Sequence, residues 1–244
     1  MKERIVIIPT YNEIENVEGI LRAVMSLPVQ IDVMIVDDGS PDGTAMKVRE
    51  LQQEFPDRIV LEERQQKSGL GTAYIHGFKK ALALGYEYIF EMDADFSHNP
   101  QDLVRLYEAC SKEGFDLAIG SRYITGVNVV NWPMSRVLMS YFASQYVRFV
   151  TGLPVQDTTA GFKCYRSNVL KTINLDKIKF VGYAFQIEMK FLTWLYGFSI
   201  KEVPIIFTDR TKGVSKMSPK IFKEAFWGVI QMKISSLFAS YQRF

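Results

Sequence analysis

Residues 4–44 have the sequence RIVIIPTYNEIENVEGILRAVMSLPVQIDVMIVDDGSPDGT, in which two short apolar runs flank a longer amphipathic stretch. The apolar runs are Arg4–Ile8 and Asp32–Val36, and Ile14–Ser26 between them repeats apolar residues at helical spacing. A strand, a helix and a second strand in this order form the unit from which parallel sheets are built. We therefore predict an α/β fold with a Rossmann-like, mostly parallel, twisted sheet flanked by helices.

The same alternation continues along the chain. Further strands are predicted at Ile59–Glu62, Tyr88–Met92, Leu117–Gly120, Phe162–Arg166 and Ile200–Ile206, and helices at Gly43–Phe55, Gly71–Leu84, Pro100–Lys112, Pro133–Val150, Phe185–Leu195 and Lys216–Phe244. No internal repeat or linker interrupts them. We expect one catalytic domain over residues 1–215, followed by an amphipathic helix over 216–244 that packs on the domain, on a membrane surface, or on both.

The composition excludes several classes of protein. With 48% hydrophobic and 23% charged residues the chain is not disordered, and a net charge of +2 does not suggest a nucleic-acid-binding protein. Its two histidines and two cysteines lack the spacing of a zinc site, and they favour a reduced, cytoplasmic compartment. We expect no signal peptide, and no apolar run reaches the roughly 20 residues that span a membrane.

The acidic segment Asp93-Ala94-Asp95 follows the predicted strand Tyr88–Met92. Ligands bind to open α/β sheets at the carboxyl ends of the strands, and carboxylate oxygens suit hard divalent cations. Residues i and i+2 of a regular strand are about 6.5 Å apart, too far for both to bind one metal directly. Either Asp95 has left the strand geometry or one aspartate binds through water.

Three other turns lie at the same edge. Asp37-Asp38-Gly39-Ser40 follows the second strand, where only one of two adjacent aspartates can face a ligand in regular geometry. Pro9–Glu13 closes the first strand; there Tyr11 could pack on a base or ribose and Glu13 could accept a hydrogen bond from a base edge. Lys67–Gly71 is either a phosphate-binding helix start or a flexible turn.

Together these segments resemble the family-2 glycosyltransferases of the GT-A fold, in particular those that transfer mannose to a dolichyl or other polyprenyl phosphate. The resemblance covers nearly the whole chain. It is carried by PTYNE at 9–13, IVDDGSPDGT at 35–44, GLGTAYIHG at 69–77, MDADFSHNP at 92–100, GSRY at 120–123 and VPIIFxDRxxGxSK at 203–216.

The resemblance implies roles for individual residues. A nucleotide pocket, for guanosine, would be lined by Pro9, Tyr11, Glu13, Val36 and Asp38. Mg²⁺ or Mn²⁺ on the donor diphosphate would be held by Asp93 and Asp95 with the backbone of Ala94. Donor or acceptor phosphates would be contacted by Arg122, Arg210 and Lys216, and Arg136 would either meet the lipid phosphate or lie at the surface.

The implied reaction transfers one sugar from GDP-mannose to a polyprenyl monophosphate with inversion. A phosphate monoester is mostly dianionic at pH 7 and needs no general base. Asp157 lies where related enzymes with hydroxyl acceptors place a base, and we expect it instead to orient an arginine or lysine. The QxxRW segment of processive family members is absent, because Gln186 is followed by Ile187-Glu188.

Three alternatives stay open from the sequence. One is a family-2 enzyme that uses UDP-glucose or another donor, or a hydroxyl acceptor on a glycan or lipid, with Asp157 as its base. Another is a nucleotidyltransferase, although those usually carry a basic glycine-rich loop where Pro9–Glu13 stands. The third is a non-catalytic binding module. If the acceptor is a lipid, we expect peripheral contact with the cytoplasmic face of a membrane through the two amphipathic helices.

Overall fold

The predicted strands pair into one sheet in the computed structural model, which describes residues 2–210 and 219–242. Its strands are β1 (Arg4–Thr10), β2 (Asp32–Asp37), β3 (Ile59–Glu63), β4 (Tyr88–Glu91), β5 (Leu117–Ser121), β7 (Lys163–Arg166) and β8 (Ile200–Pro204). They are ordered β3-β2-β1-β4-β7-β5-β8, and β7 alone pairs antiparallel with its neighbours within this sheet. The predicted α/β class and mostly parallel sheet are confirmed.

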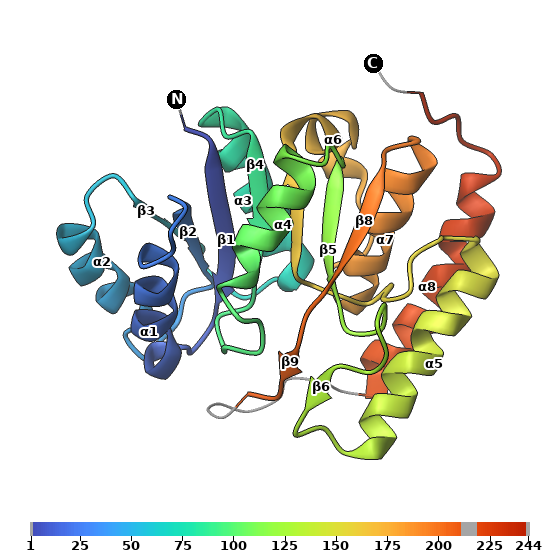
Figure 1. Cartoon of the computed structure of the whole chain (residues 1–244), viewed down its shortest axis with the longest axis horizontal. Coiled ribbons are helices and arrows are strands. Elements are labelled where there is room, and N and C mark those ends of the chain that lie inside the picture. The colour runs from blue at the N-terminus through green and yellow to red at the C-terminus, as the bar shows by residue number, and fades with distance from the viewer. Residues whose placement is uncertain (1, 211–218, 243–244) are drawn as a thin grey trace.

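Helices cover both faces of the sheet (Figure 1). They are α1 (Ile14–Met25), α2 (Thr44–Glu54), α3 (Leu70–Ala83), α4 (Asp102–Ser111), α5 (Met134–Thr151), α6 (Ser167–Thr172), α7 (Tyr183–Leu195) and α8 (Pro219–Ser236), with a short 3₁₀ turn, η1, at Leu175–Lys177. Alternate residues of β1 point to opposite faces. Val6 and Ile8 pack with α1, α2 and α4, whereas Ile5 and Ile7 pack with α3, α6 and α7.

The second half of the chain departs from the predicted boundaries. β8 ends at Pro204, and a further short strand, β9 (Phe207–Thr208), pairs in parallel with β6 (Val129–Val130) below the main sheet. Two-residue strands carry no usable periodicity, so the sequence did not predict them. The last helix ends at Ser236 and not at Phe244, and its predicted start at Lys216 lies outside the described residues.

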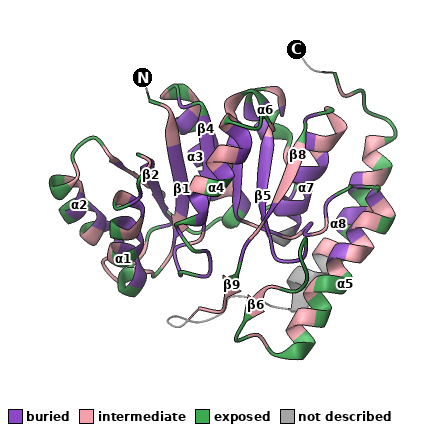
Figure 2. Cartoon of the chain, in the orientation of Figure 1, coloured by how far each residue is buried: buried purple, intermediate pink, exposed green. Residues whose placement is uncertain are grey.

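Helices α5 and α8 lie side by side at one edge of the molecule, and α8 also packs on α7 (Figure 1). Val147, Phe191 and Val229 form part of the core between the three helices. Much of α5 nevertheless faces outward (Figure 2), since its fully buried residues are Ser144, Val147 and Thr151. Among the described residues, no helix has both the length and the apolar character needed to cross a bilayer.

Candidate active site

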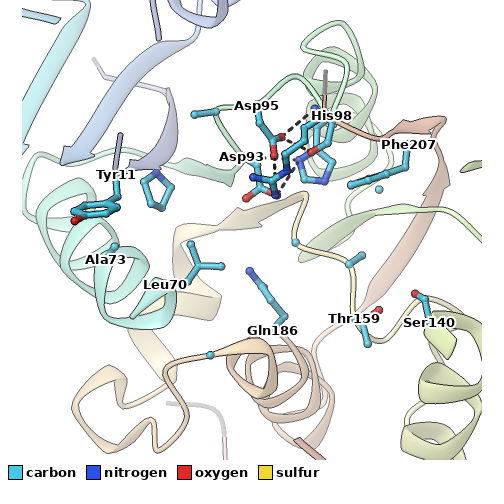
Figure 3. A pocket seen from close by; sticks show the side chains of 18 of the residues that line it. Tyr11, Leu70, Ala73, Asp93, Asp95, His98, Ser140, Thr159, Gln186 and Phe207 are labelled. Atoms are coloured by element: carbon cyan, nitrogen blue, oxygen red, sulfur yellow. Dashed lines mark hydrogen bonds and ion pairs between the residues drawn. The ribbon is translucent and has the colours of Figure 1, made fainter. Parts of the chain in front are cut away.

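A cleft of about 460 Å³ opens at the carboxyl ends of the central strands. One end is formed by the turns after β1 and β2 together with the start of α3, and the other end by α5 and β9 (Figure 3). Asp93 and Asp95 lie between the two ends. The two ends of the cleft are therefore lined by different residues, and the acidic pair lies between these ends.

The acidic pair sits in an irregular loop, because β4 already ends at Glu91. Phe96 has a φ of 58°, a backbone conformation that residues with side chains seldom adopt, and the tight bend it makes follows Asp95 directly. Of the two geometries that the sequence allowed, the structure has the one in which Asp95 has left the strand.

The two carboxylates have different partners. Asp95 accepts hydrogen bonds at Oδ1 from the backbone N–H and hydroxyl of Ser97, at 3.1 and 2.6 Å, and its Oδ2 lies 3.1 Å from Nη2 of Arg210. The Asp93 side chain is 38% exposed to the cleft. Although this side chain is open to the cleft, the surrounding walls remove part of its water, and this desolvation together with repulsion from Asp95 raises the pKa of Asp93 to about 7.

This acidic pair fits a divalent cation on the observed chemistry. Loss of water around the Asp93 carboxylate, and secondly repulsion from Asp95, raise the pKa of Asp93, and a cation held by both carboxylates would offset both effects. No group of three or more acidic, histidine or cysteine side chains able to hold a metal occurs in the described part of the chain. Two carboxylates, completed by substrate phosphates and water, are the usual protein share of a Mg²⁺ site.

His98 belongs to the same loop but does not add a positive charge to the cleft. Its ring stacks on Phe162 with centroids 4.8 Å apart, and its Nδ1 accepts a hydrogen bond from the Asp93 N–H at 3.4 Å. Burial lowers the pKa of His98 to about 4, so the ring is neutral at pH 7. Its contacts are those of a histidine that supports the loop.

The turn after β1 lines the end of the cleft that lies away from α5. Asn12 has a φ of 57°, which asparagine tolerates better than most residues, and this turn brings Tyr11 and Glu13 to the cleft. The ammonium of Lys67 lies 4.7 Å from the centre of the Tyr11 ring. Pro9 and Ala94, the residue between the two aspartates, also line the cleft.

Asp37 and Asp38 have separate roles, as adjacent strand residues should. Asp37 accepts hydrogen bonds from Thr10 and Ser40 and holds the turn. Asp38 lines the cleft, and Arg64 donates to both of its carboxylate oxygens, from Nε at 2.7 Å and Nη2 at 2.9 Å. The sequence analysis missed Arg64, although it directly follows β3, whose end lies beside that of β2.

One predicted contact, Val36, is not found at the cleft. The Val36 side chain is fully buried in the core between the sheet and α3, and it is not among the residues that line the cleft. The turn Lys67–Gly71 does border the cleft through Lys67, Gly69 and Leu70, but its Gly71 N–H donates to the carbonyl of Val181 at 2.8 Å. A Cβ at Gly71 would lie 2.8 Å from the Phe185 ring, so this glycine serves close packing of α3 on α7.

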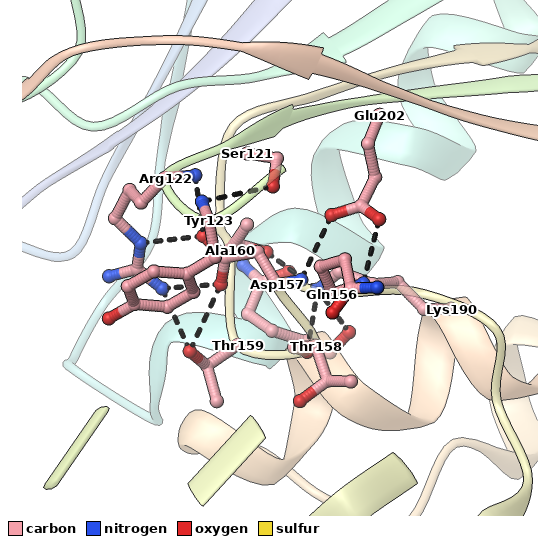
Figure 4. A network of polar contacts seen from close by, with 11 residues as sticks. Ser121, Arg122, Tyr123, Gln156, Asp157, Thr158, Thr159, Ala160, Lys190 and Glu202 are labelled. Atoms are coloured by element: carbon pink, nitrogen blue, oxygen red, sulfur yellow. Dashed lines mark hydrogen bonds and ion pairs between the residues drawn. The ribbon is translucent and has the colours of Figure 1, made fainter. Parts of the chain in front are cut away.

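The Arg122 side chain is fixed by a buried network (Figure 4). It donates to Asp157 from Nε at 2.7 Å and from Nη2 at 2.6 Å, and to Thr159 at 2.8 Å. Burial opposes ionisation of Asp157, but the charge and hydrogen bonds of Arg122 outweigh it and leave the pKa of Asp157 below 3.8. Asp157 itself is fully buried and does not line the cleft. Asp157 therefore contacts Arg122 at both carboxylate oxygens and reaches the cleft only through it.

Two further side chains hold the segment that carries Asp157 (Figure 4). Glu202 accepts hydrogen bonds from the N–H groups of Gln156 and Asp157, at 2.7 and 2.9 Å. Lys190 is fully buried, and its ammonium donates to the carbonyls of Thr158 and Ala160, at 2.9 and 2.7 Å. These hydrogen bonds hold residues 156–160 against β8 and α7.

Arg136 lies at the end of the cleft that α5 forms. Its guanidinium stacks on Trp132, 4.1 Å from the ring centre, and donates to both oxygens of Asp209 at 2.9 and 3.0 Å. Trp132 is a second residue that the sequence analysis missed, since one tryptophan in a loop carries no pattern. Lys216, the remaining predicted phosphate contact, lies outside the described residues.

Residues 5–173 match the family Glycosyl transferase family 2. Polyprenol monophosphomannose synthase from Mycolicibacterium smegmatis is 47% identical over 92% of this chain and 86% of its own length. Undecaprenyl-phosphate mannosyltransferase from Micrococcus luteus is 46% identical over 91% of this chain and 93% of its own length.

Solved structures share the fold at low identity. Glucosyl-3-phosphoglycerate synthase from Mycobacterium tuberculosis, in complex with Mn²⁺, UDP and glucosyl-3-phosphoglycerate, superposes with a TM-score of 0.68 at 15% identity, covering 96% of this chain and 80% of that one. Its complex with Mg²⁺ and UDP gives 0.69 at 16% identity, with 96% and 79% covered. The GT-A fold is thus confirmed. The match over residues 5–173 and the two relatives show that this chain is a glycosyltransferase and belongs to glycosyl transferase family 2.

Proposed function

We propose that the enzyme transfers mannose from GDP-mannose to a polyprenyl monophosphate and inverts the anomeric configuration. Two relatives at 47% and 46% identity are named for mannose transfer to polyprenol or undecaprenyl phosphate. The observation that carries the proposal is the layout of the cleft. An acidic pair suited to a metal–diphosphate lines the same cleft as Arg122, whose charge is held in place by a buried aspartate.

At the donor end, Tyr11, Glu13 and Asp38 would hold the nucleotide. A guanine edge offers three N–H hydrogens, and carboxylates are the acceptors that complement them. Asp93 and Asp95 would hold Mg²⁺ or Mn²⁺, which supplies positive charge to the departing diphosphate. Arg210, already beside Asp95, would add a second cation there, and Lys216 is proposed for the same task.

At the acceptor end, Arg122 and Arg136 would bind the polyprenyl phosphate. Trp132, Met139 and Ala143 line the cleft near these two arginines and give it an apolar wall. A phosphate at the head of a hydrocarbon chain requires this combination of fixed cations and apolar surface.

The reaction needs no proton acceptor under this proposal. An oxygen of the dianionic acceptor phosphate attacks the anomeric carbon, a new C–O bond forms, and the bond from that carbon to the β-phosphate oxygen of GDP breaks. Attack from the opposite side turns an α-linked donor into a β-linked product. Asp157 accepts from Arg122 at both oxygens, which supports an orienting role over that of a base.

We also propose that the enzyme binds the cytoplasmic face of a membrane peripherally, through α5 and the C-terminal segment 216–244. Phe149 on α5 is 90% exposed and Trp227 on α8 is 60% exposed, and the two helices pack against each other. The cleft reaches α5 at Arg136 and Met139, so an acceptor could enter from the surface that these helices contact.

A transfer assay tests the donor and the acceptor together. Purified enzyme with Mn²⁺ receives undecaprenyl phosphate and either labelled GDP-mannose or labelled UDP-glucose. We expect label in the organic phase from GDP-mannose and none from UDP-glucose. Lipid-linked product from UDP-glucose alone would contradict the proposed donor, and transfer only to added glycan or lipid hydroxyls would contradict the proposed acceptor.

A further inference from the structure

Gln186, in the first turn of α7, reaches the floor of the cleft. Its side chain rises between Leu70 and Thr159, on the side of the cleft opposite Asp93 and Asp95 (Figure 3). The residue is only 4% exposed. A Cβ at Gly161 would lie 3.5 Å from Nε2 of Gln186, so the glycine leaves the approach to this amide open.

A buried ion pair fixes which way the amide faces. Gln186 donates from Nε2 to Glu91 at 2.8 Å, and Lys163 donates to Gln186 Oε1. Lys163 also lies 3.0 Å from Glu91, and both charged side chains are fully buried. Rotating the amide by half a turn would set its NH₂ group against the ammonium and its oxygen against the carboxylate. The orientation is therefore determined by charge.

The Gln186 NH₂ group has one more hydrogen than its bond to Glu91 uses. The group carries two hydrogens, and Glu91 is its acceptor among the residues that the structure describes. Figure 3 shows the amide nitrogen directed into the cleft. A buried ion pair is a costly way to stabilise a fold, because both charges lose their hydration, whereas apolar residues of the same volume could fill that space. The arrangement is better explained by the fixed amide that it presents.

The position of Gln186 specifies what it would contact. Under the proposed function, the donor diphosphate lies at Asp93 and Asp95 and the acceptor phosphate at Arg122. The transferred sugar must lie between them, over the cleft floor. We infer that Gln186 is a specificity-determining residue whose amide N–H donates to one hydroxyl oxygen of the transferred hexose. This inference rests on the proposed transfer reaction but not on the identity of the hexose.

Two variants test it. Gln186→Met keeps the volume and removes the donor, and Gln186→Leu removes it with a branched apolar side chain; neither sets a second carboxylate against Glu91. Both are compared with wild type on the natural donor and on monodeoxy donors that each lack one hydroxyl. Gln52→Leu on α2, whose amide bonds to the Ile59 carbonyl far from the cleft, is the matched control.

We expect wild type to lose about tenfold in kcat/KM with the one deoxy donor that lacks the contacted hydroxyl, the value of one hydrogen bond. Both Gln186 variants should lose about tenfold with the natural donor and show no further loss with that deoxy donor. Deoxy penalties identical in wild type and variants would overturn the assignment. So would loss of GDP binding in both variants, measured by calorimetry, because it would make Gln186 a structural support.

The deoxy series is built on whichever sugar the wild-type enzyme transfers. Failure of GDP-mannose as donor therefore refutes the proposed function without touching the test of Gln186. If the enzyme transfers mannose, but the wild type and the Gln186 variants lose the same kcat/KM with every deoxy donor, only the role of Gln186 is refuted.

Discussion

Arg210 lies 3.1 Å from Asp95, Nη2 to Oδ2, so a cation from the segment after β9 rests on a carboxylate proposed to bind the metal. The proposed metal would thus share this acidic pair with the arginine. A metal–diphosphate bound there would have the guanidinium beside the position where negative charge develops. The pair also links the proposed donor end to β9, which carries Phe207 into the proposed acceptor end of the cleft.

Asp95→Asn should lower turnover at least about 100-fold, because charge compensation at the leaving group is lost. Folding should be preserved, since the change removes one of two mutually repelling carboxylates. Turnover and circular dichroism check these outcomes. The control is Asp176→Asn, an exposed carboxylate paired with Lys79 on the surface. Full activity of Asp95→Asn in excess chelator would contradict the metal assignment.

Asp157→Asn should destabilise the protein by about 3–5 kcal/mol at pH 7, the usual cost of leaving a buried charge without its partner. The folded pKa of Asp157 lies below the ordinary 3.8, so its stabilising contribution is fully present above pH 3.8 and is lost as pH falls through the folded value. The difference in unfolding free energy between the two proteins should therefore stay constant from pH 7 to pH 4. A difference that already vanishes near pH 5 would show that Asp157 is not held as an anion by Arg122.

Arg64→Met should raise the KM for the nucleotide sugar about tenfold with little change in kcat, because Arg64 orients Asp38 without reaching the reacting atoms. Arg64→Lys should not restore the KM, since an ammonium cannot donate to both carboxylate oxygens from a fixed fork. Steady-state kinetics give both values. Arg49→Met, which removes an exposed arginine paired with Glu63, is the control. A fall in kcat with unchanged KM would contradict this role.

Replacing both Phe149 and Trp227 by serine should weaken binding to anionic lipid vesicles at least about tenfold, because each large apolar side chain contributes roughly 1.5–3 kcal/mol when buried. Activity on a short, water-soluble prenyl phosphate should persist. Vesicle sedimentation measures the binding. Met46→Ser removes from α2, at the far end of the molecule (Figure 1), an apolar side chain about as exposed as Trp227, and it should leave binding intact. Equal loss in both variants would argue against a specific membrane surface.

The sequence predicted the fold well where apolar periodicity was long. All five strands of the first half and the helices between them occur within a few residues of their predicted ends, because burial on one or both faces imposes a repeating pattern. The acidic loop was predicted from its place after a strand. The short strands β6 and β9 were not predicted. Their pairing depends on the path of the loops that bring residues 129–130 and 207–208 together.

Partners of the site residues were harder to predict than the residues themselves. Arg64, Trp132 and Lys190 come from different parts of the chain and meet the site only through the fold. Val36 failed for the opposite reason: it follows the strand pattern perfectly, and that pattern places its side chain in the core. The sequence drew attention to Gln186 only because it begins an incomplete QxxRW segment. Its contact with Glu91 could not be predicted, because the two residues are 95 positions apart in the chain.

The central claim, direct attack by an acceptor phosphate from the side opposite the leaving diphosphate, is tested most directly by the anomeric configuration of the product. The lipid product made from GDP-mannose and undecaprenyl phosphate would be isolated, and the one-bond carbon–hydrogen coupling at its anomeric centre measured by NMR. We predict a β-mannosyl phosphodiester. An α-linked product, or mannose joined to a hydroxyl in place of the phosphate, would contradict it.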